Sequence, residues 1–338
     1  MPSIRARLVN RYIRSTMKKI PLHELEPVDL RRMIEARAVP FHSKKVTVET
    51  VTTPIAGEWQ RPNALDGRGP FTLLYLHGGG YVFGSPKTHR SISFPLAQGA
   101  GAEVFSLDYR LAPENPCPAA IEDAVAAFKW LLSTGRAPSQ ICVAGDSAGG
   151  GLALSMMQAL AREGLPQPAC AVLYSPYTDL AGEGASVTAN AESDAMFQAE
   201  SIRIGGLRYA GTVDVKDGRC SPLYGDFAGL PPTLVFASKS EMLYDDATRA
   251  VEKARSAGRD VTFVERDGLI HVWPVFHPLM PEAREAIDQS VAFMASHAVE
   301  RDSNDTDAAG FVSSSSTQQP GGADNGDTDN KSLAHGEL

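Results

Sequence analysis

The chain has 338 residues, of which 43% are hydrophobic and 21% are charged, and its formal net charge is −8. This apolar content is enough to bury a large core, and one domain with additions fits the length better than two domains. No run of 18 apolar residues occurs, and the first residues lack the compact apolar region of a signal peptide. These features argue against a membrane-spanning chain, and we expect a soluble, cytoplasmic protein.

The N-terminal segment, residues 1–40, stands apart by its charge. Its first twenty residues hold six basic and no acidic side chains. Apolar residues recur there at helical spacing: Ile4, Leu8, Val9, Tyr12, Ile13 and Met17. Such a helix is typical of a membrane surface, and also of a helix that packs over an active site with its basic face outward. The residues alone leave both interpretations open.

Strand-like and helix-like segments alternate from Val46 to His297. This order predicts the α/β class, with a mainly parallel central sheet flanked by helices on both faces. Sheets of this kind bind ligands at the carboxyl ends of their strands. Motifs that directly follow a strand are therefore the first candidates for a functional site.

A glycine cluster follows the apolar strand Phe71–Leu76, in the order His77-Gly78-Gly79-Gly80. It matches the HGGG loop described for lipases and esterases, in which a backbone N–H helps to bind an oxyanion. Developing charge on a carbonyl oxygen needs donors already in place. We predict Gly78 and Gly79 as those donors, and we expect His77 to shape the loop rather than to carry protons.

The stretch ICVAGDSAGGGLAL, residues 141–154, places one serine between glycines after another apolar strand. Gly145, Ser147 and Gly149 form the pattern G-x-S-x-G, in which the serine occupies a strained elbow between a strand and a helix. This elbow predicts Ser147 as a nucleophile and aims the N–H of Ala148 at the developing oxyanion. We expect Asp146 to hydrogen-bond the elbow rather than to take part in the chemistry.

A serine hydroxyl needs a base, and the order of catalytic residues in α/β-hydrolases places that base after the nucleophile. Four histidines follow Ser147: His271, His277, His297 and His335. His271 lies just beyond the strand-like Val261–Glu265, and we predict it as the base, with His277 as a weaker alternative. His297 ends a helix-like segment, and His335 lies in a low-complexity tail.

Three acidic residues follow the preceding strand: Glu241, Asp245 and Asp246. A carboxylate that orients a histidine has to be held at the end of a strand, which favours Glu241. Asp245 and Asp246 are suited to the first turn of the next helix, where negative charge is favourable.

Cysteine spacing and phosphate motifs give no sign of a cofactor. The cysteines lie far apart, at Cys117, Cys142, Cys170 and Cys220, and we expect neither a disulfide framework nor a metal site. No lysine follows GDSAGGG to bind phosphate, and no G-x-G-x-x-G opens the first strand turn. We expect no cofactor and no nucleic-acid partner.

The C-terminal segment from about residue 302 is rich in Ser, Gly, Asp and Asn, and we expect it to be disordered. It carries seven acidic residues, Asp302, Asp305, Asp307, Asp324, Asp327, Asp329 and Glu337, against the single basic Lys331. Six of the eight net negative charges therefore belong to this tail, and they say little about the substrate.

Together these motifs resemble those of the bacterial hormone-sensitive-lipase-like esterases, family IV, which have the α/β-hydrolase fold. The resemblance covers roughly residues 45–300 and rests on segments in the family's order: HGGGYVFGSPKTHR, LDYRLAPENPCPAAIEDA, GDSAGGGLAL, SPLYGDFAGLPPTL, EMLYDDA and LIHVWPVF. It implies Ser147 as nucleophile, His271 as base, and Gly78, Gly79 and Ala148 as oxyanion donors. Glu241-Met242-Leu243 stands in register with the family's D-P-L motif, which implies Glu241 as the acid.

The resemblance also implies a domain organisation and a substrate class. Residues 1–40 would form a helical cap together with an insertion at about 185–215, on a catalytic domain of residues 41–300, followed by a disordered acidic tail, 301–338. We expect a serine carboxylesterase that hydrolyses short-chain acyl esters without stable membrane insertion, and a homodimer would be ordinary for the family. A lactonase or amidase of this fold, or a non-catalytic small-molecule receptor, is the alternative, and the intact Ser147, His271 and acid argue against the receptor.

Overall fold

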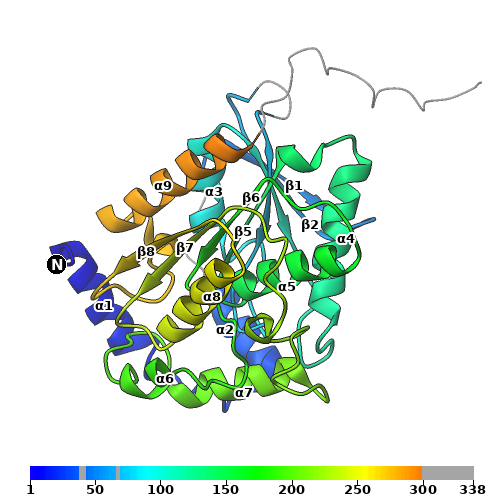
Figure 1. The fold of residues 1–338 in the computed structure, drawn as a ribbon. Coiled ribbons are helices and arrows are strands. Elements are labelled where there is room, and N and C mark those ends of the chain that lie inside the picture. The colour runs from blue at the N-terminus through cyan, green and yellow to red at the C-terminus, as the bar shows by residue number, and fades with distance from the viewer. Residues whose placement is uncertain (38–42, 66–68, 299–338) are drawn as a thin grey trace, which may run out of the picture. The chain divides into compact units, whose positions relative to one another are not determined.

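The structure, a computed structural model, describes residues 1–37, 43–65 and 69–298. In these residues eight strands form one sheet, in the order β1-β2-β4-β3-β5-β6-β7-β8 (Figure 1). The strands are β1 (Val46–Val51), β2 (Gly57–Pro62), β3 (Thr72–Leu76), β4 (Glu103–Leu107), β5 (Ile141–Asp146), β6 (Cys170–Tyr174), β7 (Thr233–Ser238) and β8 (Val261–Arg266). Strand β2 runs antiparallel to both β1 and β4, and the other neighbouring strands pair in parallel. The predicted α/β class with a mainly parallel sheet is confirmed.

Helices cover both faces of the sheet (Figure 1). The α-helices are α1 (Ile4–Thr16), α2 (Pro27–Arg37), α3 (Arg90–Ala100), α4 (Ala119–Ser133), α5 (Ala148–Arg162), α6 (Ala185–Ala189), α7 (Ala199–Ala210), α8 (Tyr244–Ser256) and α9 (Pro281–His297). Short 3-10 turns lie at η1 (Pro138–Gln140), η2 (Pro222–Tyr224) and η3 (Trp273–Phe276). Helices α1, α3 and α9 share one hydrophobic core with the sheet, and α4, α5 and α8 share another.

The two cores follow from the alternation of side chains along each strand. On β3, Leu73 and Tyr75 point into the core beneath α3 and α9, whereas Leu74 and Leu76 point into the core beneath α4 and α5. All four side chains are buried. A strand buried on both faces is mostly apolar, which is why β3, β5 and β6 stand out in the sequence as short apolar runs.

Two segments from distant parts of the chain pack together beside the carboxyl ends of the strands. One is the N-terminal segment with α1 and α2, and the other spans α6 and α7 (Figure 1). The Lys18 ammonium donates to the carbonyls of Ala191 and Asp194, and the Arg208 guanidinium donates to those of His23 and Leu25. These bonds use backbone acceptors, so they fix the two segments to each other without an ion pair.

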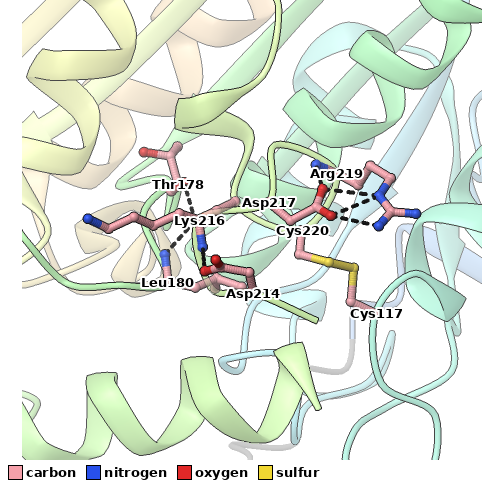
Figure 2. Close-up of a disulfide and its surroundings, with 9 residues drawn as sticks. Cys117, Thr178, Leu180, Asp214, Lys216, Asp217, Arg219 and Cys220 are labelled. Carbon is pink, nitrogen blue, oxygen red and sulfur yellow. Dashed lines mark hydrogen bonds and ion pairs between the residues drawn. A yellow bond between two sulfur atoms is a disulfide. The ribbon is translucent and has the colours of Figure 1, made fainter. Parts of the chain in front are cut away.

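Cys117 and Cys220 form a disulfide across 103 residues of sequence, with their Cα atoms 5.9 Å apart (Figure 2). The expectation that the chain lacks a disulfide is therefore wrong. The loop before α4 meets the last turn of α7, where the Cys117 N–H donates to the Tyr209 carbonyl at 2.8 Å. Figure 2 shows the turn that presents Cys220, closed by the Asp217 carboxylate on the N–H and guanidinium of Arg219. Sequence spacing holds no trace of such a tertiary contact.

The other two cysteines are buried and form no disulfide. Cys142 on β5 and Cys170 on β6 are paired residues of adjacent strands, both fully buried and both free. They act as small apolar side chains in the core beneath α3 and α9.

Of the helices in the described ranges, none combines the length and the apolar character needed to cross a bilayer. The expected acidic tail, 301–338, lies outside the described residues.

Replacing Cys117 and Cys220 together by serine is expected to lower the free energy of unfolding by about 2–5 kcal/mol, because the cross-link restricts a long loop of the unfolded chain. Denaturant unfolding of the wild type and of Cys117→Ser/Cys220→Ser measures this. Adding a reductant should weaken the wild type and leave the double variant unchanged. Equal unfolding midpoints for all samples would contradict the prediction.

Candidate active site

The elbow at Ser147 joins the end of β5 to the first turn of α5. Ser147 has φ 53° and ψ −119°, a conformation that costs a non-glycine residue about 1–3 kcal/mol. The backbone is held there by the Ser147 N–H, which donates to the Tyr174 carbonyl at 2.8 Å, and by the Tyr177 N–H, which donates to the Ser147 carbonyl at 2.9 Å. The strained turn predicted from G-x-S-x-G is therefore present, and it brings Ser147 to the wall of a pocket.

The glycines around Ser147 are explained by close backbone contacts. A Cβ on Gly145 would lie 2.3 Å from the Gly149 carbonyl oxygen, and one on Gly149 would lie 2.0 Å from the Leu76 carbonyl oxygen. Real Cβ atoms do not approach backbone oxygens so closely. Small residues here allow α5 to start directly against the end of β3, which places the serine beside the glycine loop that follows β3.

The glycine loop departs from the prediction in one residue. The Gly78 N–H donates to Asp146 Oδ1 at 3.0 Å. Because this N–H is already engaged, Gly78 is not available as an oxyanion donor, and the prediction is corrected at this residue. Gly79 and Gly80 line the pocket with Ser147, and no hydrogen bond of the described residues uses their N–H groups or that of Ala148. Both glycines have positive φ, 122° and 59°, which turns their backbone in a way that L side chains rarely allow.

The buried carboxylate of Asp146 binds the glycine loop. Asp146 accepts hydrogen bonds from the Tyr75 hydroxyl at 2.6 Å and from Gly78, and its Oδ2 lies 3.4 Å from Nε2 of His89. Burial alone would raise the pKa of Asp146, but the charge and hydrogen bond of His89 and the bond from Tyr75 outweigh burial and lower it. Asp146 therefore remains an ionised acceptor that ties the loop after β3 to the elbow after β5.

His77 has the structural part expected of it. Its side chain is fully buried, its Nδ1 donates to the Gly78 carbonyl at 2.8 Å, and its ring stacks on Tyr109 with centroids 4.2 Å apart. Burial, helped by the charge of His89, lowers the pKa of His77 to about 3. The Tyr109 hydroxyl donates to the His77 carbonyl at 2.8 Å. His77 therefore stays neutral and holds the loop.

Glu241 and His271 meet after the ends of β7 and β8. Nδ1 of His271 lies 2.7 Å from Glu241 Oε2, and the other carboxylate oxygen accepts the Ser238 N–H at 2.8 Å. The relative exposure of the two side chains is only 1% and 2%. Nε2 of His271 is buried and has no hydrogen-bond partner among the described residues. One ring nitrogen is thus fixed by a carboxylate, while the other is left for a reacting group.

The charges around His271 favour its protonated form. Burial alone would lower the pKa of His271, but the hydrogen bond and charge of Glu241, together with the charges of Asp194 and Asp146, outweigh burial and raise the pKa above its ordinary value. A histidine in this setting is a stronger base than a free one. It is also better able to hold the proton that it has taken.

Asp194, which sequence reasoning missed, braces this pair from the segment between α6 and α7. Its Oδ1 accepts the N–H groups of Met196 and Phe197, and its Oδ2 accepts the Met242 N–H at 3.0 Å. The Phe197 ring in turn meets the His271 ring edge-on, with centroids 5.2 Å apart. Asp194 belongs to no sequence motif, so its role in positioning Phe197 can be recognised only from the three-dimensional structure.

The remaining candidates lie elsewhere. Asp245 accepts the Ser186 N–H, and Asp246 accepts the N–H groups of Thr178 and Asp179. Both carboxylates lie in the first turn of α8 and bind the backbone of other segments there. Burial raises the pKa of Asp246 to about 8. His277 lies just past η3, and no hydrogen bond among the described residues joins its side chain to a carboxylate. His297 is the last residue of α9, as expected, and His335 is outside the described residues.

The pocket beside Ser147 has an open volume of about 560 Å³, part of it continuous with solvent. Ser147 and the glycine loop lie in its lining. The N-terminal segment contributes Leu22, His23 and Leu30, and the α7 region contributes Phe197, Ser201, Ile202, Gly205 and Arg208. Mostly apolar walls with a few polar groups are typical of a small-molecule site.

Comparison with known proteins identifies the class. Residues 73–275 match a family described as having the alpha/beta hydrolase fold. An acetyl-hydrolase of Streptomyces hygroscopicus is 47% identical over 237 residues, which cover 70% of this chain and 78% of that protein. The crystal structure of an esterase from the bacterial hormone-sensitive lipase family superposes with a TM-score of 0.81 at 37% identity, over 88% of this chain and 99% of that one.

A crystal of the esterase EstE5 soaked in p-nitrophenyl butyrate gives a TM-score of 0.82 at 37% identity, over 87% of this chain and 99% of that one. The chain belongs to the α/β-hydrolase-fold family, among the bacterial hormone-sensitive-lipase-type esterases. The resemblance noted in its sequence is confirmed, and so is the expected class of enzyme, a carboxylic ester hydrolase.

Gly149→Ala is expected to destabilise the protein by at least ~2 kcal/mol, because the new Cβ would collide with backbone that cannot move aside. Gly205→Ala on α7 is the matched control, since its Cβ would meet only the Gly80 carbonyl oxygen at 3.9 Å. In a helix this change should be neutral or stabilising by up to about 1 kcal/mol. Urea unfolding of both variants measures the two changes in stability. Similar midpoints for the two variants would show that the close contact at Gly149 does not limit the size of this residue.

Proposed function

We propose that the protein is a serine carboxylesterase in which Ser147 is the nucleophile, His271 the general base and Glu241 the residue that orients the histidine. The observation that carries this proposal is the state of His271. Its Nδ1 is fixed on a buried carboxylate at 2.7 Å, while its Nε2 is buried and has no hydrogen-bond partner in the described part of the chain. Ser147 stands on a strained elbow and lines the same pocket as the glycine loop, which provides the nucleophile and the oxyanion donors of the proposed mechanism.

The reaction proceeds in two acyl transfers. His271 Nε2 removes the proton of the Ser147 hydroxyl as its oxygen attacks the ester carbonyl, and the resulting imidazolium then protonates the leaving alcohol. Water repeats the sequence on the acyl-enzyme and releases the acid. Glu241 holds the ring in the tautomer with a proton on Nδ1 and stabilises the imidazolium.

The oxyanion of each tetrahedral intermediate is bound by the backbone N–H groups of Gly79, Gly80 and Ala148. This set replaces Gly78, whose N–H is held by Asp146, with the next glycine that lines the pocket. Ala148 is the first residue of α5, so its N–H points away from the helix at the positive end of the helix dipole. Removing one such donor typically raises a barrier by about 3 kcal/mol.

The substrates are esters of short acyl chains, and the cap limits their length. The support is the pocket wall, because the N-terminal segment and the α7 region both line it and are hydrogen-bonded to each other. We propose these two segments, residues 1–40 and about 185–215, as the cap on the catalytic domain of residues 41–300. Two segments that line the pocket beside the nucleophile limit the room for an acyl chain, which favours a small acyl group over a long one.

In the cytoplasm, the location proposed from the sequence, thioredoxin and glutathione keep most thiols reduced. Cys117 and Cys220 would be a pair of thiols there. In an oxidising compartment the same two cysteines would form the disulfide that the structure contains.

Ser147→Ala should lower kcat/KM for p-nitrophenyl esters by at least ~10³-fold, because the residual rate comes only from binding and the oxyanion donors. Activity of the wild type is expected to peak at short chains in a series from acetate to laurate. Ser133→Ala, at an exposed serine near the end of α4, is the control and should keep full activity. A folded Ser147→Ala enzyme with wild-type turnover would exclude the proposed nucleophile, and an inactive wild type would favour a receptor.

Glu241→Gln should reduce kcat by on the order of 10³–10⁴-fold, as loss of the orienting carboxylate does in other serine hydrolases. It should also move the acidic limb of the pH–rate profile to lower pH. Catalysis needs neutral His271, whose pKa Glu241 raises, so removing the charge lowers the pH at which the base becomes protonated. Asp245→Asn is the control, and a larger loss or limb shift there would assign the acid to Asp245 instead.

A further inference from the structure

Helix α1 has two faces with different surroundings. Its inner face, with Ala6 and Ile13, is buried in the core shared with α3 and α9. The helix is fixed there by hydrogen bonds from Ser3 to the Glu282 carboxylate at 2.6 and 3.0 Å and from the Asn10 amide to the Gly268 carbonyl at 2.7 Å. The helix is therefore docked on the body of the enzyme, and its outer face has a defined direction.

The outer face carries a row of large apolar side chains in solvent. Ile4, Leu8 and Tyr12 are 69%, 62% and 65% exposed. Residues four apart lie above one another on a helix, so these three form one continuous stripe. Exposed apolar side chains are ordinary when scattered, whereas a stripe on one helix face indicates an interaction surface.

Arginines flank this stripe on both sides. Arg5 lies on one side, and Arg7 and Arg11 lie on the other; all three side chains are exposed. No ion pair or hydrogen bond between described residues engages these three guanidinium groups. Arg14 differs, because it donates to the carbonyls of Glu192 and Ser193 and so belongs to the packing of the enzyme itself.

We propose that the outer face of α1 binds the surface of an anionic lipid bilayer, with the helix lying in the plane of the interface. An amphipathic helix binds there through its apolar residues, while arginines on its flanks pair with anionic headgroups. Tyrosine is suited to this depth, because its ring is apolar and its hydroxyl stays hydrated. A second copy of the chain fits this face poorly, because it would bring two sets of unpaired arginines together.

Binding in this orientation has a consequence for access to the active site. The chain that leaves α1 continues to Leu22 and His23, which line the pocket beside Ser147. The face that meets the bilayer therefore belongs to the same segment that covers the pocket. Esters dissolved in the bilayer would reach the enzyme at its cap, whereas water-soluble esters would need no membrane.

The test is sedimentation of the full chain with vesicles of phosphatidylcholine alone and of phosphatidylcholine with an equal amount of phosphatidylglycerol. We expect binding to the anionic vesicles only, and its loss at high salt, since screening removes the charge attraction. Ile4→Ser/Leu8→Ser/Tyr12→Ser and Arg5→Gln/Arg7→Gln/Arg11→Gln should each weaken binding by roughly tenfold or more. Hydrolysis of p-nitrophenyl butyrate in solution should be unchanged in both, which separates this proposal from the catalytic one.

The control is Val28→Ser/Leu207→Ser, which removes exposed apolar side chains outside α1, at 48% and 44% exposure. It should bind vesicles like the wild type. Equal binding of the wild type and both α1 variants would overturn the proposal, as would a wild type that stays in the supernatant with anionic vesicles. Dimers that sediment in the ultracentrifuge and dissociate only in the apolar variant would assign the stripe to a second copy instead.

Discussion

The left-handed backbone of Ser147 is the constraint on which the site depends. The serine can stand out from the sheet only because α5 begins directly against β3, and that approach requires Gly149 beside the Leu76 carbonyl. The same approach places the glycine loop after β3 next to the serine, where Asp146 binds it. Strain at one residue is thus balanced by packing in two fully buried strands and one helix.

The second half of the site is built by the neighbouring strands. Glu241 and His271 follow β7 and β8, and the Phe197 ring, which Asp194 positions, packs edge-on against the His271 ring. Burial strengthens the hydrogen bond between Glu241 and His271, because little water competes for either partner. The proposed cap therefore has two tasks: it lines the pocket beside Ser147, and through Phe197 it keeps water away from Glu241 and His271.

The sequence was sufficient for the features that local pattern determines. Apolar runs predicted β3 and β5, the alternation of Val261–Glu265 predicted β8, and the glycine spacing predicted the elbow, because buried strands, half-buried strands and tight turns each demand particular residues. Contacts between distant segments left no such signal. The Cys117–Cys220 disulfide, the brace by Asp194 and the capture of the Gly78 N–H by Asp146 all depend on how loops meet after folding.

The proposed mechanism requires that Ser147 is a nucleophile made reactive by His271 and Glu241. Diethyl p-nitrophenyl phosphate phosphorylates activated serines, so treatment of the enzyme with this reagent, followed by tandem mass spectrometry of the adduct, tests this requirement. We expect one diethylphosphoryl group per chain, on Ser147, with activity lost in proportion to labelling. Labelling at another residue with parallel loss of activity, or full activity in a chain labelled at Ser147, would contradict it.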